Sequence, residues 1–357
     1  MRTTLLAVVA IAAVTGTGTV VGVAPTAAAP PAPAIELFTA DGRTPLSDTP
    51  VHIGDTIVVR GRGFDPEANT SGLPVPVPPG VPHGIFVTFG AFAPDWRPSQ
   101  GAPTSARAAQ RSAVKWVLSE SALDRVPSAP FDFQRTIRHQ WVELEPEGDF
   151  TARLQVRVPE QIPADARFGV YTYGAAEAVN AEQELAASVV FDPAPGPNAP
   201  PPPPRDLQWA FAPSFEDTVT DTLQGTLAGS GGAGVHDDGS LGFTFDSADL
   251  DATGYGTVRY RGTVVAATRF HLGEIALGNP WIEFTPEGTW LTAETSTSDT
   301  VGADSLTRTR LARLDTGPVA GTTSWTDVPA RFEPTVRPAS LLPYANTQAA
   351  PISFRIG

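Results

Sequence analysis

The chain has 357 residues, enough for two ordinary domains, and it contains no cysteine. Disulfide bonds, thiolate metal sites and cysteine nucleophiles are therefore excluded. The formal net charge is −14, so we expect no nucleic-acid partner, because contacts to phosphates need a basic surface. Each domain must be held by its apolar core alone, which is feasible for units of about 150 residues.

Residues 1–29 have the pattern of a secretory signal peptide. Arg2 supplies the positive start, an apolar run follows at 5–14, and the segment ends in three alanines at Ala29. This apolar run is too short to span a bilayer securely, and no second long apolar run follows it. The sequence predicts a secreted protein, extracellular or associated with the cell envelope, without a transmembrane segment in the mature chain.

Residues 30–192 are expected to form an Ig-like β-sandwich. Runs rich in β-branched and aromatic residues alternate here with turns rich in Gly, Pro and Asp. The segments GRGFDP at 61–66 and GVYTY at 169–173 resemble those of bacterial Ig-like domains of exported proteins. The predicted strands are 35–38, 51–53, 56–64, 85–90, 140–144, 150–158, 168–173 and 187–191.

Residues 105–118 are the best helix candidate of the chain. Ser105 can cap the first turn, and several alanines favour a helical interior. In such a helix Arg107, Arg111 and Lys115 lie on one face at spacings of four. We expect this basic face to be solvated, and the alternative is a contact for an anionic envelope polymer or partner.

The proline-rich segment 193–206 is the clearest boundary in the chain. A run such as PPPPP favours the extended polyproline II conformation and acts as a semi-rigid spacer. It is expected to hold two domains apart, so that 207–357 form a second domain with its own core. This second half is again rich in predicted strands, with one short helix expected near 214–224.

Catalytic motifs do not stand out in either half. The sequence contains no GxSxG, no HExxH and no phosphate-binding loop, so we expect a protein that is not an enzyme. Haem is a ligand that the composition permits. Its iron is usually held by His, Cys, Met or Tyr, and the mature chain keeps only His and Tyr. The candidates in the second half are His236, His271, Tyr255, Tyr260 and Tyr344.

Four segments of 207–357 resemble, in order, those of the HtaA domain, a haem-binding module of exported haem-uptake proteins. The resemblance implies a second β-sandwich after the Ig-like one. It also implies a haem carrier or scavenger of the cell envelope, with haem, haemoproteins and other envelope haem-uptake proteins as partners. The segments are LQWAFAPSFEDTV at 207–219, GTVRYRG at 256–262, HLGEIALGNPWIEF at 271–284, and SWTDVPARF at 324–332 with LLPYANTQAAPISF at 341–354.

The resemblance also implies the residues of a haem site. Ser214 and Tyr344 match the family's contacts to the haem propionates, and His271 matches the histidine that supports the tyrosine ligand of the iron. The position of that tyrosine is occupied here by Thr218. A threonine hydroxyl is far less acidic than a phenol and is not a usual haem ligand.

Three outcomes follow from this substitution. His271 replaces the tyrosine as the iron ligand, or Tyr260 or Tyr255 supplies a phenolate, or the domain has lost haem and kept only its sandwich. The last outcome corresponds to an envelope adhesion or scaffold protein.

Overall fold

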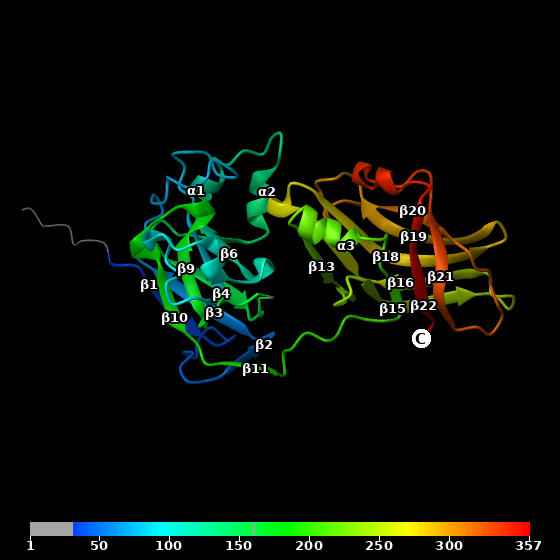
Figure 1. Ribbon diagram of the computed structural model, residues 1–357, viewed down its shortest axis with the longest axis horizontal. Helices are drawn as coiled ribbons and strands as arrows, with labels where there is room; N and C mark the ends of the chain where they lie inside the picture. Colours follow the sequence, from blue (N-terminus) through cyan, green and yellow to red (C-terminus); the bar gives the residue numbers. More distant parts are fainter. Residues whose placement is uncertain (1–30, 160) are drawn as a thin grey trace, which may run out of the picture. The chain divides into compact units, whose positions relative to one another are not determined.

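The computed structural model describes residues 31–159 and 161–357, and the predicted signal peptide lies outside this part (Figure 1). Strands dominate both halves of the described chain, so the all-β prediction is confirmed. No helix in the described ranges is long and apolar enough to cross a membrane.

The first half contains strands β1 to β11 and two short α-helices. Strands β1, β3 and β8 form one sheet; β10, β9, β4, β6 and β7 form a second sheet, to which β5 adds on β4; β11 pairs with β2. The bounds are β1 (Ala34–Phe38), β2 (Val51–Ile53), β3 (Thr56–Arg62), β4 (Ile85–Phe92), β5 (Arg107–Ala108), β6 (Lys115–Leu118), α1 (Glu120–Leu123), α2 (Phe133–Arg138), β7 (Trp141–Glu143), β8 (Phe150–Gln155), β9 (Arg167–Gly174), β10 (Leu185–Ser188) and β11 (Phe191–Pro195), with 3₁₀ turns η1 (Pro98–Gln100), η2 (Thr104–Ala106), η3 (Arg111–Ala113), η4 (Ala175–Glu177) and η5 (Ala181–Gln183).

The core of the first half lies between its two larger sheets. Strand β8 alternates buried and exposed residues, as expected for a strand with one face on a core. Ile57 of β3, Val87 of β4, Leu154 of β8 and Val170 of β9 are all fully buried in one cluster. This packing of sheet on sheet is a β-sandwich, and the Ig-like topology stays a prediction.

The helix predicted at 105–118 is wrong. The segment forms short 3₁₀ turns and two strands, and its last strand, β6, pairs with β4. Trp116, Val117 and Leu118 are consecutive buried residues, which suits a strand covered on both faces and not a helix with one apolar face. The predicted basic face therefore does not exist.

The second half is built around one large sheet of strands β12 to β22. The bounds are β12 (Leu207–Trp209), α3 (Phe215–Asp217), the π turn η6 (Thr218–Thr222), β13 (Thr226–Ser230), β14 (Ala233–Val235), β15 (Leu241–Leu250), β16 (Gly256–Arg261), β17 (Thr263–Ala267), the 3₁₀ turn η7 (Arg269–His271), β18 (Glu274–Thr285), β19 (Gly288–Ser296), β20 (Leu306–Leu314), β21 (Ser324–Phe332), the 3₁₀ helix η8 (Ala339–Tyr344) and β22 (Gln348–Arg355). The predicted short helix near 214–224 corresponds to α3 and η6.

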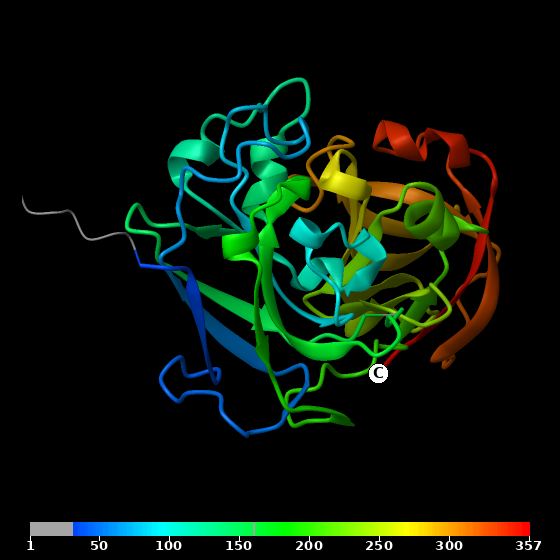
Figure 2. The same cartoon turned by 60° about the vertical axis from the view of Figure 1, so that its left-hand side comes forward.

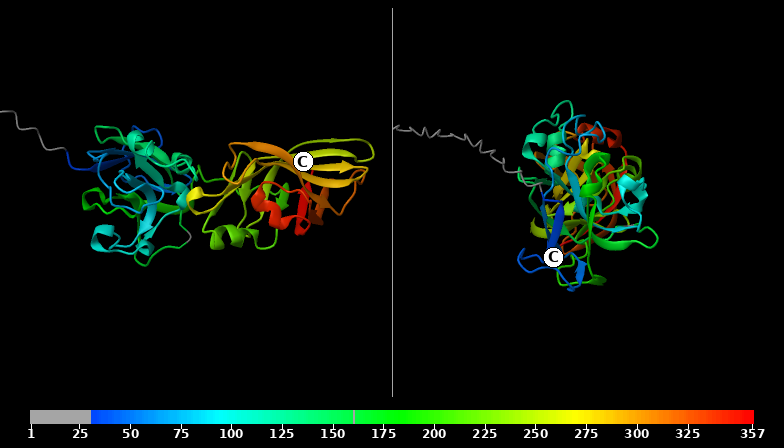
Figure 3. Two further views of the ribbon diagram at one scale, coloured as in Figure 1. Left: turned by 90° about the horizontal axis from the view of Figure 1, so that it is seen from above. Right: turned by 90° about the vertical axis from the view of Figure 1, so that its left-hand side faces the viewer.

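The large sheet closes on itself. Its pairings run β18-β16-β15-β12-β22-β21-β20-β19, and β19 pairs again with β18. Strands β18 and β19, yellow to orange in Figure 3, are long enough to join two parts of the sheet. Closure leaves few unpaired edges and encloses a core that includes Trp209, Phe243, Leu291 and Phe354, all almost completely buried. The Nε1 of Trp209 donates to the Ala350 carbonyl at 3.0 Å.

An ion pair joins the two ends of this closed sheet. The Asp206 carboxylate, just before β12, accepts from the Phe245 amide at 2.8 Å and from Arg355 Nη2, at the end of β22, at 2.6 Å. Burial opposes the ionisation of Asp206, but these hydrogen bonds and the charge of Arg355 outweigh it, so its pKa is lowered. The start and the end of the second half are thereby held together.

The predicted spacer is partly structured. Its first residues, up to Pro195, belong to β11, and the segment from Gly196 to Arg205 contains no strand or helix. No hydrophobic cluster of the described residues combines buried side chains from both sides of the spacer. The two halves have separate hydrophobic clusters and polar contacts join them, while the division into two domains at the spacer stays a prediction.

Leu291 tests the closed core. Leu291→Ala removes a side chain with no exposed surface, and we expect a loss of about 2–5 kcal/mol in the free energy of unfolding. Urea unfolding followed by tryptophan fluorescence measures this loss. Leu342→Ala, at a side chain that is 54% exposed, is the control and should change stability by less than about 0.5 kcal/mol. Equal effects of the two substitutions would contradict the packing.

Asp206 tests the ion pair between the ends. Its pKa is lowered on folding, so the ionised form stabilises the fold above its ordinary pKa of 3.8, and this contribution is lost as the pH falls through the lowered value. At pH 7 Asp206→Asn should cost about 1 kcal/mol, because Arg355 is largely in water. The difference from wild type should shrink below pH 3.8 and vanish once the pH is below the lowered pKa of Asp206, whereas the exposed Asp237→Asn should match wild type throughout.

Candidate functional site

Ser214 and Thr218 lie on the short helical segment that follows β12. Ser214 precedes α3 in a left-handed conformation, with φ of +57°, and its side chain is exposed. The Thr218 hydroxyl, one turn later, donates to the Ser214 carbonyl at 2.7 Å. The hydroxyl of Thr218 is thus engaged by its own helical turn, as is common for threonine.

Tyr344 belongs to η8. Figure 2 shows η8 in red at the same end of the second half as α3. Its ring contacts Phe211, Phe215 and Phe332, with centroid distances of 5.4, 6.3 and 5.6 Å. Burial raises the pKa of the half-buried Tyr344 phenol. The structure therefore brings together the Ser214 and Tyr344 segments, through Phe215.

A small apolar cavity lies beneath these two segments. Its volume is about 20 Å³, which suffices for about one water molecule, whereas ligand pockets usually measure about 300–1,000 Å³. The enclosed space does not hold a macrocycle with the surrounding segments in these positions. The cavity is lined by Phe211, Phe215, Leu227, Leu241, Val264, Ala266, Ile275, Ala276, Leu277, Thr295 and Leu341.

His271 ends the 3₁₀ turn η7 and has a positive φ of +52°. Its Nδ1 donates to the carboxylate of Glu274, the first residue of β18, whose side chain is 3% exposed. Burial opposes the ionisation of Glu274, but hydrogen bonds from His271 and Arg135 outweigh it, so the pKa of Glu274 is lowered. In the tautomer that carries its proton on Nδ1, Nε2 holds the lone pair.

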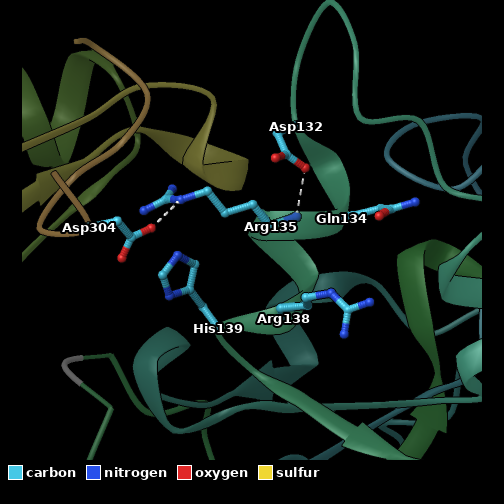
Figure 4. Close-up of a pocket in the computed structure, with 6 residues that line it drawn as sticks. All are labelled: Asp132, Gln134, Arg135, Arg138, His139 and Asp304. Carbon is cyan, nitrogen blue, oxygen red and sulfur yellow. Dashed lines mark hydrogen bonds and ion pairs between the residues drawn. The ribbon is translucent and has the colours of Figure 1, made fainter. Parts of the chain in front are cut away.

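The first half supplies the other partners of Glu274. Nη1 of Arg135, on α2, lies 2.6 Å from the Glu274 carboxylate. Nε of the same residue donates to Asp304 at 2.7 Å, the contact that is dashed in Figure 4. These two acids raise the pKa of Arg135 against the effect of burial. The ring of His139, just after α2, stacks on the ring of His271 with centroids 5.6 Å apart and planes 18° apart.

An open pocket of about 310 Å³ lies beside this cluster. The guanidinium of Arg135 donates to Glu274, Asp304 and the Val301 carbonyl, so it has few N–H groups left to bind a further ligand. No group of three or more His, Asp and Glu side chains in the described part of the chain is arranged to hold a metal ion directly. The pocket is lined by Asp132, Gln134, Arg135, Arg138, His139 and Asp304 (Figure 4).

Tyr260 lies elsewhere in the domain, inside the closed sheet. Its side chain is 1% exposed, and its hydroxyl donates to the Arg355 carbonyl at 3.0 Å. Burial and the charge of Asp206 raise the pKa of the phenol, which disfavours the phenolate form that binds iron. These contacts favour a structural role for Tyr260 near the ion pair of Asp206.

Sequence reasoning missed Glu274, Arg135 and His139. A signal for Glu274 was present, because it is a carboxylate three residues after His271 at the start of an otherwise apolar strand. Arg135 and His139 carry no such signal, since they are more than 130 residues away in the chain. Ile275, four residues after His271, lines the apolar cavity together with Phe215, whereas His271 does not line it.

The donor chemistry at His271 fits a haem-iron ligand. An imidazole with one nitrogen bound to a carboxylate and the other nitrogen free is the usual arrangement of metal-binding histidines. The imidazole of a histidine is also an established axial ligand of haem iron, as in globins and peroxidases. The residues Ser214, Tyr344 and His271 therefore fit haem in chemistry, and the volume of the cavity requires α3 with η6, or η8, to move.

Comparisons with known proteins address the second half. No curated protein matches the chain. Among solved structures, it is similar to the N-terminal domain of HtaA from Corynebacterium glutamicum, with 16% identity over 42% of this chain and 96% of that one and a TM-score of 0.34. The C-terminal domain of the same protein is 20% identical over 41% of this chain and 92% of that one, with a TM-score of 0.32. Heme binding protein HtaB of that organism is 14% identical over 42% of this chain and 90% of that one, with a TM-score of 0.31.

The family comparison is the decisive one. The family model HtaA, described as Htaa, matches residues 205–355. That segment begins at the end of the proline-rich spacer and contains the whole closed sheet, from β12 to β22. The segment 205–355 is therefore similar to the HtaA family, and it is called the HtaA domain below after that match.

Proposed function

We propose that the HtaA domain of this chain binds haem, with Nε2 of His271 as the iron ligand. The observation that carries the proposal is the hydrogen bond from His271 Nδ1 to the buried Glu274 carboxylate. Such a carboxylate fixes the tautomer and the orientation of the ring, and it raises the basicity of the nitrogen that faces the metal. The family match and the haem-binding neighbour HtaB support haem as the ligand class.

Thr218 does not take the place of the family's tyrosine. Its neutral hydroxyl is a poor iron ligand and already donates to the Ser214 carbonyl. The half-buried phenol of Tyr344 and the exposed hydroxyl of Ser214 are polar groups at the same end of the domain, suited to the carboxylates of the propionates. In the proposal these two residues orient the macrocycle, and His271 holds the iron.

Entry of haem requires an opening of the domain. The cavity under Phe215 and Leu341 is apolar and holds about one water, so the ligand enters by displacing α3 with η6, or η8. The five residues of η6 form a π turn, a local irregularity that is frequent at functional sites. Burial of the apolar macrocycle against the exposed aromatic and aliphatic lining then offsets the cost of opening.

The proposed setting is the cell envelope. The signal-peptide pattern, the family match and the lack of a catalytic motif are consistent with a secreted carrier or scavenger in haem uptake that is not an enzyme. Its partners would be haem, haemoproteins and other envelope haem-uptake proteins.

His271 is the first test of this function. We expect the wild-type protein to develop a Soret band on titration with haemin, and we expect His271→Ala to lose that band or to bind at least 10-fold more weakly, because the iron loses its ligand. His52→Ala is the matched control, since His52 is also paired with a carboxylate, Asp55, but lies in the first half. Unchanged binding by His271→Ala would refute the assignment of the ligand.

Thr218 provides a test in the opposite direction. Thr218→Tyr restores the phenol that the family resemblance implies at this position, and we expect tighter haem binding with the absorption spectrum of a tyrosinate-ligated iron. Thr220→Tyr, two residues along η6, is the control and should keep the wild-type spectrum. A Thr218→Tyr protein whose haem spectrum equals that of wild type would show that residue 218 does not face the iron.

The small cavity favours one alternative function. If haemin produces no Soret band in the wild-type protein, the domain is a closed β-structure without its ligand, and the chain is better described as an envelope adhesion or scaffold protein. Absorbance of the purified protein before and after addition of haemin separates these two functions.

A further inference from the structure

We propose that Arg135 and His139, which lie outside the HtaA domain, are positioning residues that complete its His271 site. This inference rests on the proposed function of His271 as a ligand. It assigns a role to the first half of the chain, namely to orient the histidine of the second half. The site is then composite, and the isolated HtaA domain would contain an incomplete version of it.

Arg135 supplies the first argument. Its guanidinium spans two segments of the HtaA domain, because it contacts Glu274 at the start of β18 and both Asp304 and the Val301 carbonyl between β19 and β20. The planar fork of arginine fixes such contacts in direction as well as in distance. The Glu274 side chain is 3% exposed, so its orientation depends on its few partners, which are chiefly Arg135 and His271.

His139 supplies the second argument. Its ring lies nearly parallel to that of His271, and its Nε2 is 3.9 Å from the Glu274 carboxylate. It therefore covers one face of the His271 ring, whose side chain remains 27% exposed. The imidazole is bounded by a carboxylate at Nδ1 and by a second ring at one face, which restricts its rotation.

A separate contact holds the neighbouring segment. Arg111 of the first half donates to the carbonyl of Gln224, which follows η6. The side chain of Gln224 in turn accepts from Arg269 of η7 at 2.8 Å. The first half thus contacts both segments that carry the site, the end of η6 after Thr218 and the turn that ends at His271.

These contacts predict how the loss of Arg135 changes the affinity of the domain for haem. Removal of the guanidinium leaves Glu274 with His271 as its main partner and frees the carboxylate to reorient. The Nδ1–H form of His271 is then no longer enforced, and haem affinity should fall about 10–100-fold, the usual effect of losing a residue that orients a metal ligand.

The experiment measures His271 directly, in the full chain and without haem. Two-bond ¹H–¹⁵N spectra of the ¹⁵N-histidine protein report the tautomer of each of the five histidines, and His271→Ala assigns the signal. We expect wild type to show the Nδ1–H form of His271 and Arg135→Gln to lose it. Arg138→Gln, on the same helix but without a contact to Glu274, is the matched control and should leave the signal unchanged. An unchanged His271 signal in Arg135→Gln would overturn the proposal.

A second variant, Asp304→Asn, provides the test if the Arg135→Gln protein does not fold. Asp304 is 60% exposed, so Asp304→Asn loosens Arg135 without leaving a buried charge unpaired. It should shift the His271 signal in the same direction as Arg135→Gln, and by less, with an unaltered circular dichroism spectrum. An Asp304→Asn signal identical to that of wild type, together with an unfolded Arg135→Gln protein, would count against the proposal.

Haemin titration then distinguishes the claim that the protein binds haem from the claim that Arg135 positions His271. A wild-type protein without a Soret band refutes haem binding, and the tautomer of His271 still decides whether Arg135 positions it. A wild-type protein that binds haemin, combined with an Arg135→Gln protein of equal affinity and equal spectrum, refutes the positioning role alone. A 10–100-fold weaker Arg135→Gln protein, with Arg138→Gln like wild type, supports both.

Discussion

The organisation of the candidate site depends on one buried carboxylate. Glu274 is removed from water, and an unpaired charge there would be costly, so its position requires cationic or hydrogen-bonding partners. Arg135 and His271 meet that requirement from opposite sides of the spacer. The same interaction therefore compensates a buried charge, joins the two halves of the chain and orients a histidine. A change in any one of these three functions has consequences for the other two.

The closed sheet provides the rigid frame for this arrangement. Strand β18 starts at Glu274 and continues through the core to Thr285, paired along both edges. The side chains proposed to bind the ligand lie outside the strands, on the residue before α3 and on η7 and η8. A rigid sheet that carries short irregular segments at one end is a common basis for binding sites, because the segments can move while the sheet keeps them in register.

The sequence predicted the strands well where a local pattern determines them. β3, β4 and β9 follow from β-branched and aromatic runs between turns, and the HtaA resemblance brought out Ser214, His271 and Tyr344 from short ordered segments. It failed at 105–118, where alanines favoured a helix locally but the pairing of β6 with β4 prevailed. It also missed Arg135, because a contact between residues 139 positions apart leaves no periodic trace in a single sequence.

The pairing of β12 with β22 has a consequence for how this domain can be built into longer chains. The first and last strands of the HtaA domain are neighbours, and the Arg355 amide donates to the Asp206 carbonyl at 2.8 Å. Entry and exit of the polypeptide therefore lie side by side at one end of two neighbouring strands. A domain with adjacent termini can be inserted into a loop of another protein, or circularly permuted, with little disturbance to either fold.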